Sequence, residues 1–197
     1  MNLEKAEKYI IGQLRLRLSD TLYYHGIHHV EDVTNACLNL AGQERVTDEE
    51  AIKLLRTAAL YHDSGFMNTY QKHEEEGCRI VREMLPDFGY TESQIELVCG
   101  MIMATKIPQN PRNHLEQIIC DADLDYLGRE DFEPIAETLF QELKIRKIVT
   151  DQQSWNQIQI KFLTAHHYWT KSATKQRASA KAKHLAYLVE LAEKSQK

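Results

Sequence analysis

The sequence has few cysteines, glycines and prolines, and it has no linker-like segment. Four of its 197 residues are cysteine, eight are glycine and four are proline. The four cysteines lie far apart and form no CxxC pair, so the pattern favours buried reduced thiols over a disulfide framework or a thiolate metal site. They are Cys37, Cys78, Cys99 and Cys120. The length suits one hydrophobic core and no repeat is visible, so we expect a single domain over residues 1–197.

Long apolar runs are also absent, and so is an excess of positive charge. No segment is apolar over the length that spans a bilayer, and charges interrupt the first twenty residues, unlike a secretory signal. We therefore expect a cytoplasmic protein without a membrane partner. The formal net charge of -5 argues against nucleic acid as a partner, because neutralising phosphates takes an excess of Lys and Arg. The sequence leaves the oligomeric state open.

Helical periodicity is present over most of the chain. Apolar residues recur three and four positions apart, and alternating strand patterns with tight hairpin turns are absent. This predicts an all-α fold of roughly eight helices. A capping-box pattern between Thr47 and Glu50 predicts a helix that runs toward His62, and Thr91 and Ser154 predict two further helix starts.

Three separated segments concentrate metal-ligating side chains. They are YYHGIHHVEDV at 23–33, ALYHDSG at 59–65 and ICDADLDYLG at 119–128. In the first segment His25 and His29 are four apart and would share one face of a continuous helix, whereas His28 would point elsewhere. In the second segment His62 and Asp63 come at a predicted helix end, where both can face one ion.

The third segment places three carboxylates among apolar residues. Asp121, Asp123 and Asp125 have neighbours that predict burial, and a buried carboxylate needs a partner, of which a cation is the strongest. Each segment alone is weak evidence, because a lone histidine on an apolar helix is more often a hydrogen-bonded core residue than a ligand. The three together, in an all-helical chain, indicate a metal site.

The order of an HxxxH-like segment, ALYHD and DADL resembles the H…HD…D signature of the HD superfamily. These are helical, metal-dependent phosphohydrolases that include cyclic-nucleotide phosphodiesterases and deoxynucleotide triphosphohydrolases. The resemblance covers about residues 20–145, and we expect C-terminal helices over 154–197 to pack on this core. HEEEG at 73–77 and ATKIP at 104–108 are similar to predicted HD phosphohydrolases whose substrates are unassigned. The resemblance implies an HD-type helical bundle and a phosphoric ester hydrolase.

The resemblance also implies roles for individual residues. The implied metal ligands are His29, His62, Asp63 and Asp123. YHGIHHVEDV resembles the phosphodiesterase pattern YHNxxHxxDV, in which the second histidine binds metal and the first protonates the leaving group, so His25 is the implied acid. The family pattern ADL falls on residues 122–124, which favours Asp123 as the ligand and leaves Asp121 as a candidate for a supporting or second-metal role.

The sequence departs from better-known members at two places. Ala104 and Thr105 stand where two-metal relatives carry a histidine, which weighs against a complete second site. The segment HDSGF lacks the lysine that some members place after the HD pair, and Lys106 could supply that charge from another element. His73 and Glu74 could border the pocket or form part of a second metal site. An exposed position is the alternative for His73 and for Lys106.

Two imidazoles and two carboxylates suit a divalent ion, among which the sequence does not choose between Mn²⁺, Fe²⁺, Co²⁺, Ni²⁺, Zn²⁺ and Mg²⁺. Open positions on such an ion allow water to bind and attack phosphorus, with Asp63 or Asp123 orienting the water. His25 could protonate the departing oxygen and Lys106 could stabilise the phosphoryl oxygens. The expected substrate is a nucleotide or another small phosphate ester, either a monoester or a diester.

The C-terminal stretch 166–183 carries five basic residues and no acidic one. A solvated helix face explains such a run, and the alternative is recognition of a second phosphate with Tyr168 or Trp169 stacking on a base. We expect His166 and His167 to be structural. Two other function classes remain open, a non-catalytic nucleotide-sensing module and a di-iron oxygenase of the HD type. The intact ligand set counts against the first, and the missing histidine against the second.

Overall fold

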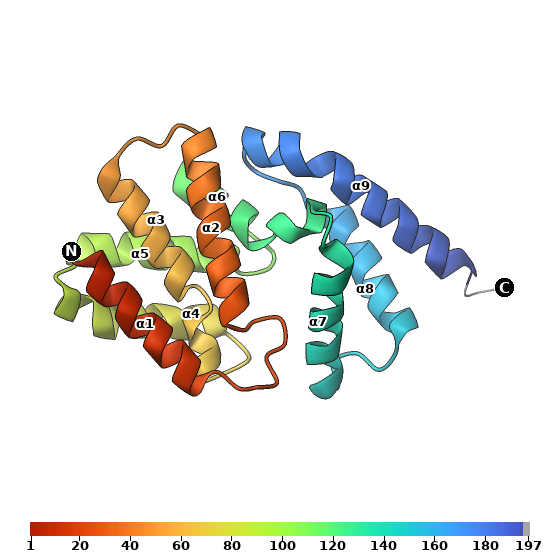
Figure 1. The fold of residues 1–197 in the computed structure, drawn as a ribbon, viewed down its shortest axis with the longest axis horizontal. Coiled ribbons are helices and arrows are strands. Elements are labelled where there is room, and N and C mark those ends of the chain that lie inside the picture. Colours follow the sequence, from red (N-terminus) through yellow and green to blue (C-terminus); the bar gives the residue numbers. More distant parts are fainter. Residues whose placement is uncertain (195–197) are drawn as a thin grey trace.

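The computed structural model describes residues 1–194, and within them the chain forms nine α-helices, three short 3₁₀ helices and no strand (Figure 1). The α-helices are α1 (Leu3–Arg17), α2 (Ile27–Gln43), α3 (Glu49–Tyr61), α4 (His73–Met84), α5 (Glu92–Thr105), α6 (His114–Asp123), α7 (Phe132–Ile145), α8 (Gln152–Ala165) and α9 (Lys171–Lys194). The 3₁₀ helices are η1 (Ser64–Met67), η2 (Leu85–Phe88) and η3 (Asp125–Gly128). The all-α prediction is confirmed, with one helix more than the rough count of eight. Residues 195–197, the end of the expected C-terminal helices, lie outside the described residues.

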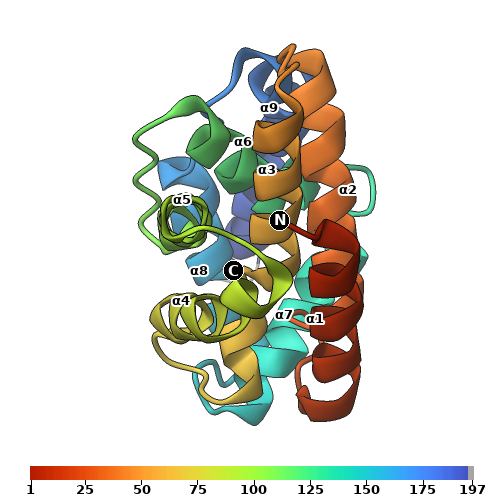
Figure 2. The ribbon, with the colours of Figure 1, turned by 90° about the vertical axis from the view of Figure 1, so that its left-hand side faces the viewer.

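Two clusters of buried apolar side chains organise these helices. The first is shared by α1 to α6 and includes Ile10, Leu55 and Ile102. The second is formed mainly by η3, α7, α8 and α9 and includes Phe140 and Trp155. Figure 1 shows α1 to α6 at the left and α7 to α9 at the right. Figure 2 is turned by 90°, so that the side formed by α1 to α6 faces the viewer. The fold therefore has an N-terminal bundle and a C-terminal helical layer that meet near η3.

Two helices begin at positions other than those predicted. The cap of α3 is Asp48 and not Thr47, since the Asp48 carboxylate accepts the backbone N–H of Glu50 at 3.0 Å. Ser154 lies inside α8 as its third residue, and it completes a capping box whose cap is Asp151. In both cases an aspartate near the predicted cap takes its place, because an ionised carboxylate is a strong acceptor for the free N–H groups of a first turn.

Other local predictions are confirmed. Thr91 and Gln94 form the expected capping box at the start of α5. The helix α3 ends at Tyr61, so His62 is its C-terminal cap and the HD pair lies at a helix end. The helix α4 begins at His73. These ends place polar side chains at the inner edge of the bundle.

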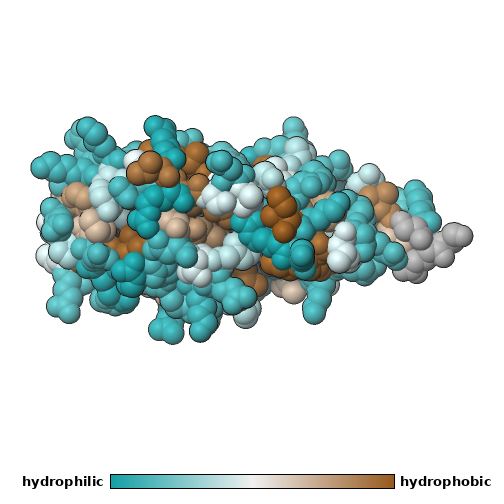
Figure 3. Space-filling view, turned by 90° about the horizontal axis from the view of Figure 1, so that it is seen from below, coloured by the Kyte–Doolittle hydropathy of each residue, from teal (hydrophilic) through white to brown (hydrophobic). Residues whose placement is uncertain are grey.

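The face that Figure 3 shows is mostly hydrophilic, and apolar side chains form separate patches on it. Within the described residues, none of the helices combines the length and the apolar character needed to cross a bilayer.

Candidate metal centre

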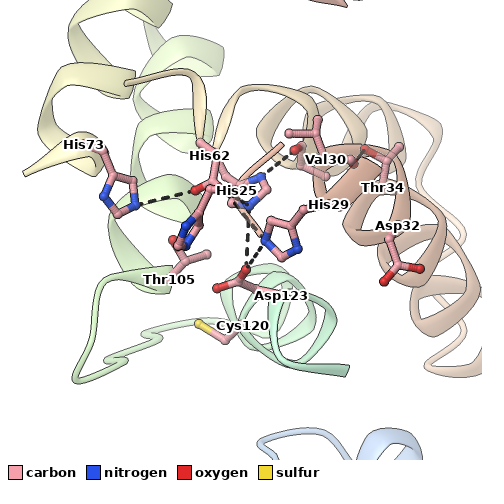
Figure 4. Close-up of polar contacts among 12 residues, drawn as sticks. His25, His29, Val30, Asp32, Thr34, His62, His73, Thr105, Cys120 and Asp123 are labelled. Atoms are coloured by element: carbon pink, nitrogen blue, oxygen red, sulfur yellow. Dashed lines mark hydrogen bonds and ion pairs between the residues drawn. The ribbon is translucent and has the colours of Figure 1, made fainter. Parts of the chain in front are cut away.

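Three side chains from three helices of the bundle converge on one point (Figure 4). His29 lies in the first turn of α2, His62 caps α3 and Asp123 is the last residue of α6. One nitrogen or oxygen atom of each lies within 4.8 Å of the others. His29 Nε2 is 3.1 Å from Asp123 Oδ1, and His62 Nε2 is 3.6 Å from the same oxygen. The three segments singled out in the sequence therefore meet in space.

Asp63 extends this group to four residues. Its Oδ2 atom is 3.3 Å from His62 Nε2 and 3.6 Å from His29 Nε2, and its side chain is buried. We refer to His29, His62, Asp63 and Asp123 as the central cluster. The structure thus brings together the four residues that the resemblance implies as ligands.

The middle of the central cluster contains buried polar atoms without hydrogen-bond partners. His62 Nδ1 is 2.7 Å from the carbonyl oxygen of Ala59 and must donate its proton there, so in the neutral ring Nε2 carries a lone pair. His62 Nε2 and Asp63 Oδ2 are both buried and unpartnered. Such atoms are unfavourable unless a cation or a proton lies between them. A metal-binding histidine is commonly oriented by a backbone carbonyl in this way, so these residues fit a divalent ion.

The two carboxylates of the central cluster are held in the ionised form. Burial raises the pKa of Asp63, but the neighbouring His62, His25 and His29 outweigh it and the pKa lies below its usual range. Burial also raises the pKa of Asp123, but its contacts with His29 and His62 lower it to about 2. Both carboxylates are therefore ionised and available as ligands to a cation.

His25 lies beside the central cluster, but not on the helix that the sequence predicts for it. The helix α2 begins at Ile27 after the cap Gly26, so His25 precedes the helix and does not share a helical face with His29. The prediction that His25 and His29 share a helical face is therefore wrong. Their rings nevertheless come near each other, with centroids 5.9 Å apart. His28 is exposed, as predicted.

Glu142 of α7, which the sequence analysis missed, holds the ring of His25. Its side chain is fully buried, and its Oε1 atom is 2.6 Å from His25 Nδ1 and accepts the hydroxyl proton of Tyr70 at 2.9 Å. Its Oε2 atom accepts the backbone N–H groups of Tyr24 and His25, at 2.9 and 3.1 Å. One carboxylate thus fixes both the backbone and the ring of His25.

The pairing also changes the proton affinity of His25. Burial lowers the pKa of His25, but the hydrogen bond to Glu142 and the charge of Asp63 raise it above its ordinary value. Burial raises the pKa of Glu142, but His25 lowers it to about 2. The sequence held one signal for this residue. Glu142 follows Ile135 and Leu139 at helical spacing, where an apolar side chain is expected.

His73 and Glu74 lie on the outer side of Asp63. His73 Nε2 is 3.5 Å from Asp63 Oδ1 and 3.6 Å from Glu74 Oε1. Burial lowers the pKa of His73, which favours a neutral ring. Glu74 is buried at the start of α4. Both residues therefore border the central cluster, which agrees with the position expected of them.

The turn after the HD pair packs against both His25 and His73. The ring of Phe66 in η1 contacts both imidazoles, with centroids 4.4 Å from His25 and 3.9 Å from His73, and the two imidazole centroids are 6.2 Å apart. A Cβ atom on Gly65 would lie 1.9 Å from the carbonyl oxygen of His73. Only glycine permits this contact, so η1 packs directly on the start of α4.

Two residues predicted for the site lie elsewhere. Asp121 is buried, but its carboxylate accepts the backbone N–H groups of Trp169 and Thr170, each at 2.8 Å, and the Thr170 hydroxyl at 2.7 Å. It therefore ties the start of α9 to α6. Lys106 is exposed, and its ammonium group pairs with Glu75 on the surface. Lys106 does not line the cavity beside the cluster, so the structure gives no support for its expected role at the phosphoryl oxygens, which stays a prediction.

A cavity of about 230 Å³ opens from the cluster. Its polar end is lined by His25, Asp63, His73 and Asp123, and its walls continue along η3, α7 and α8. None of the five basic residues between 166 and 183, all of them in the described part of the chain, lines this cavity. Arg177 instead pairs with Asp125 through two hydrogen bonds. The lining of this cavity therefore gives no support for a second phosphate site in residues 166–183.

His166, which we expect to be structural, contacts the C-terminal layer. Lys181 lies 3.2 Å from His166 Nδ1, and the ring stacks on Phe162 at 6.1 Å between centroids. These contacts hold α9 against α8 and do not involve the central cluster.

Comparison with known proteins agrees with this geometry. The family model described as HD domain matches residues 26–125. A solved structure from an uncultured Thermotogales bacterium, described as a predicted HD superfamily hydrolase, is similar over 96% of this chain and 90% of that chain, with a TM-score of 0.57 and 22% sequence identity. At this identity the likeness concerns the fold. No curated protein matches the sequence.

Proposed function

We propose that this chain, which belongs to the HD domain family, is a metal-dependent phosphohydrolase that acts on a small phosphate ester. The observation that carries the proposal is the pair of buried, unpartnered atoms His62 Nε2 and Asp63 Oδ2 at the centre of four converging ligand-type side chains. A cavity that can admit a small molecule begins at the same point.

The central cluster would hold the ion. Two imidazoles and two carboxylates suit a divalent ion of the first transition series better than an ion that prefers only oxygen ligands. When bound there, such an ion supplies Lewis acidity toward a phosphoryl oxygen and toward water. His73, which contacts the outer oxygen of Asp63 and is itself contacted by Glu74, would orient that carboxylate or, with Glu74, contribute to a second ion.

His25 and Glu142 would deliver the proton that the leaving group needs. Hydrolysis joins a water oxygen to phosphorus and breaks the bond between phosphorus and the alcohol oxygen, with the net transfer of one proton from water to the alcohol. Because His25 Nδ1 is bonded to Glu142, Nε2 is the ring nitrogen left for the substrate. Glu142 favours the protonated ring, so His25 can give a proton to the alcohol oxygen and regain one from the attacking water.

The test compares two substitutions in the metal-loaded protein. Asp123→Asn removes a charge from the central cluster, and we expect it to lose both bound metal and hydrolysis of alkyl phosphates. His28→Gln alters an exposed neighbour of the cluster and should keep both. Elemental analysis and release of inorganic phosphate are the measurements. A wild-type protein that binds no divalent metal and hydrolyses no phosphate ester with added Mn²⁺ or Co²⁺ would contradict the proposal.

A further inference from the structure

The cavity beside the central cluster changes character along its length. At the cluster its lining is polar, but farther along it is formed by Leu139 and Leu143 of α7 and by Trp155, Ile158 and Phe162 of α8. A molecule whose phosphate lies at the cluster would place its remaining atoms among these side chains. Their chemistry therefore determines which alcohol the site can accept.

The apolar walls offer no partner for a second negative charge. Within residues 1–194, no lysine or arginine lines the cavity, and the acidic lining residues are Asp63, Glu74 and Asp123 at the polar end. A further phosphate or carboxylate on the substrate would lose its hydration without gaining a counter-ion, which is strongly unfavourable. The alcohol part of the substrate must then be uncharged.

The walls also offer few free hydrogen-bonding groups. The hydroxyl of Thr105 donates to the carbonyl of Ile102 at 2.8 Å, and the side-chain amide of Gln159 donates to Asn156 at 3.5 Å. The other polar groups of the lining beyond the cluster are the hydroxyls of Tyr24 and Tyr126 and the indole N–H of Trp155. A ribose and a nucleobase together present more donors and acceptors than these few groups can satisfy, and each one left unpaired in a buried site reduces affinity.

The volume sets the size of the group that fits. An enclosed cavity of about 150 Å³ is enough to admit benzene, and this cavity measures about 230 Å³ including its polar end. Part of that space would be taken by the phosphate. The remainder matches one aromatic ring or a short alkyl chain.

We infer that the cavity binds the alcohol part of the phosphate ester, and that this part is apolar, uncharged and about the size of a phenyl or hexyl group. The inference rests on the proposed phosphohydrolase function. It adds a substrate class, the phosphate esters of small apolar alcohols, and it places selectivity in α7 and α8.

A series of alkyl phosphates tests this without changing the chemistry of the leaving group. Ethyl, butyl and hexyl phosphate are compared with glycerol phosphate and a nucleoside 5′-monophosphate in the metal-loaded protein. Each buried methylene should raise kcat/KM about fourfold until the cavity is full. We expect hexyl phosphate to exceed glycerol phosphate and the nucleotide by at least about tenfold. A preference for the nucleotide or for glycerol phosphate would overturn the inference and leave the proposed function intact.

Two matched variants test whether the preference for longer alkyl chains comes from this cavity. Ile158 lines the cavity and is 43% exposed, while Ile145 at the end of α7 is 52% exposed and does not line it. Ile158→Gln should reduce the ratio of hexyl to ethyl phosphate hydrolysis by at least about fourfold, whereas Ile145→Gln should leave the ratio unchanged. An equal reduction in both variants, or in neither, would show that the alkyl chain does not lie in this cavity.

A binding measurement separates the inference from the proposed function. Trp155 lines the cavity, and the chain has two tryptophans, so in a Trp169→Phe protein the fluorescence reports on Trp155. Hexan-1-ol should change this signal in a saturable way and glycerol should not, with or without metal. Saturable hexanol binding in a protein that hydrolyses no ester would refute the function and support the cavity assignment. No hexanol binding in a protein that hydrolyses polar esters would refute the inference alone.

Discussion

Residues 26–125, which match the family model, and residues 126–194, which follow them, contribute different groups to one cavity. The first segment contains the whole central cluster at its polar end. The second supplies α7 and α8, which form most of the apolar wall. The part of the chain that matches the family model thus carries the ligand-type residues, while the part beyond the match carries most of the apolar surface of the cavity.

The His25–Glu142 pair does not follow this division. His25 lies just before the matched residues and Glu142 lies well after them, yet they are joined by a hydrogen bond of 2.6 Å beside the central cluster. A match to the family model therefore says nothing about the residues that we propose for proton delivery. The predictions below separate the contributions of the two segments and of this pair.

The largest expected effect is on proton delivery. His25→Gln should retain metal but lower kcat for an alkyl phosphate by a factor on the order of 10² to 10⁴, the usual contribution of a positioned general acid. A nitrophenyl ester should lose much less, because its leaving group departs without a proton. Equal losses on the two esters, measured by steady-state kinetics at saturating metal, would remove His25 from the mechanism.

Metal binding should stabilise the first segment and with it the whole fold. At a concentration of about 100 times its Kd, an ion that binds only the folded state adds about 2.7 kcal/mol to the free energy of unfolding. In a chain of this size that corresponds to a Tm increase of roughly 5–10 °C. Thermal melts with and without the ion should show this increase in the Ile158→Gln variant and not in Asp123→Asn. A Tm increase in both would place the ion elsewhere.

Glu142→Gln tests the connection from the second segment to His25. The glutamine keeps the size of the side chain but removes the charge that favours a protonated His25 ring, so kcat for an alkyl phosphate should fall about tenfold to a hundredfold, as for other residues that orient a functional group. KM and metal content should change little. The loss of kcat should be smaller on a nitrophenyl ester, whereas a purely structural defect would reduce kcat equally on both esters. The measurement is the ratio of the two losses in steady-state kinetics.

The smallest effect is expected from Asp121→Asn. Asp121 and Asp123 are two residues apart, but the carboxylate of Asp121 binds the backbone before α9 and not the central cluster. An asparagine turns an N–H group toward these donors, so the free energy of unfolding in urea should fall by about 1–2 kcal/mol. Metal content and kcat should be those of the wild type. Loss of metal in this variant would mean that Asp121, and not Asp123, is the metal ligand.

Much of the site could be predicted because its signals are local. The HD pair at the end of α3 and the ADL pattern at the end of α6 place ligand-type side chains at helix ends, and the structure brings His29, His62, Asp63 and Asp123 together. Helix type and several helix ends followed from periodicity and caps. Assignment of these four residues as ligands stays a prediction until metal is measured.

The remaining features depend on contacts between distant parts of the chain. Glu142 lies 117 residues from His25 in sequence, and its only local sign was a charge at an apolar position. Lys106 was expected to replace the phosphate-binding lysine that is missing after the HD pair, but it pairs with Glu75 on the neighbouring α4. The cavity also depends on how α7 and α8 pack, which cannot be predicted from the sequence of either segment alone.

The carboxylate that positions His25 belongs to α7, and the same helix turns Leu139 and Leu143 toward the cavity. An exchange of α7 with that of a relative would therefore alter substrate choice and proton delivery together, unless Glu142 is retained in the graft. The helix α8 contributes Trp155, Ile158 and Phe162 to the wall, and within the described chain its recorded hydrogen bonds do not reach His25 or the ligand-type residues. Engineering of a new specificity should begin on α8, where the binding surface can be rebuilt while the acid stays in place.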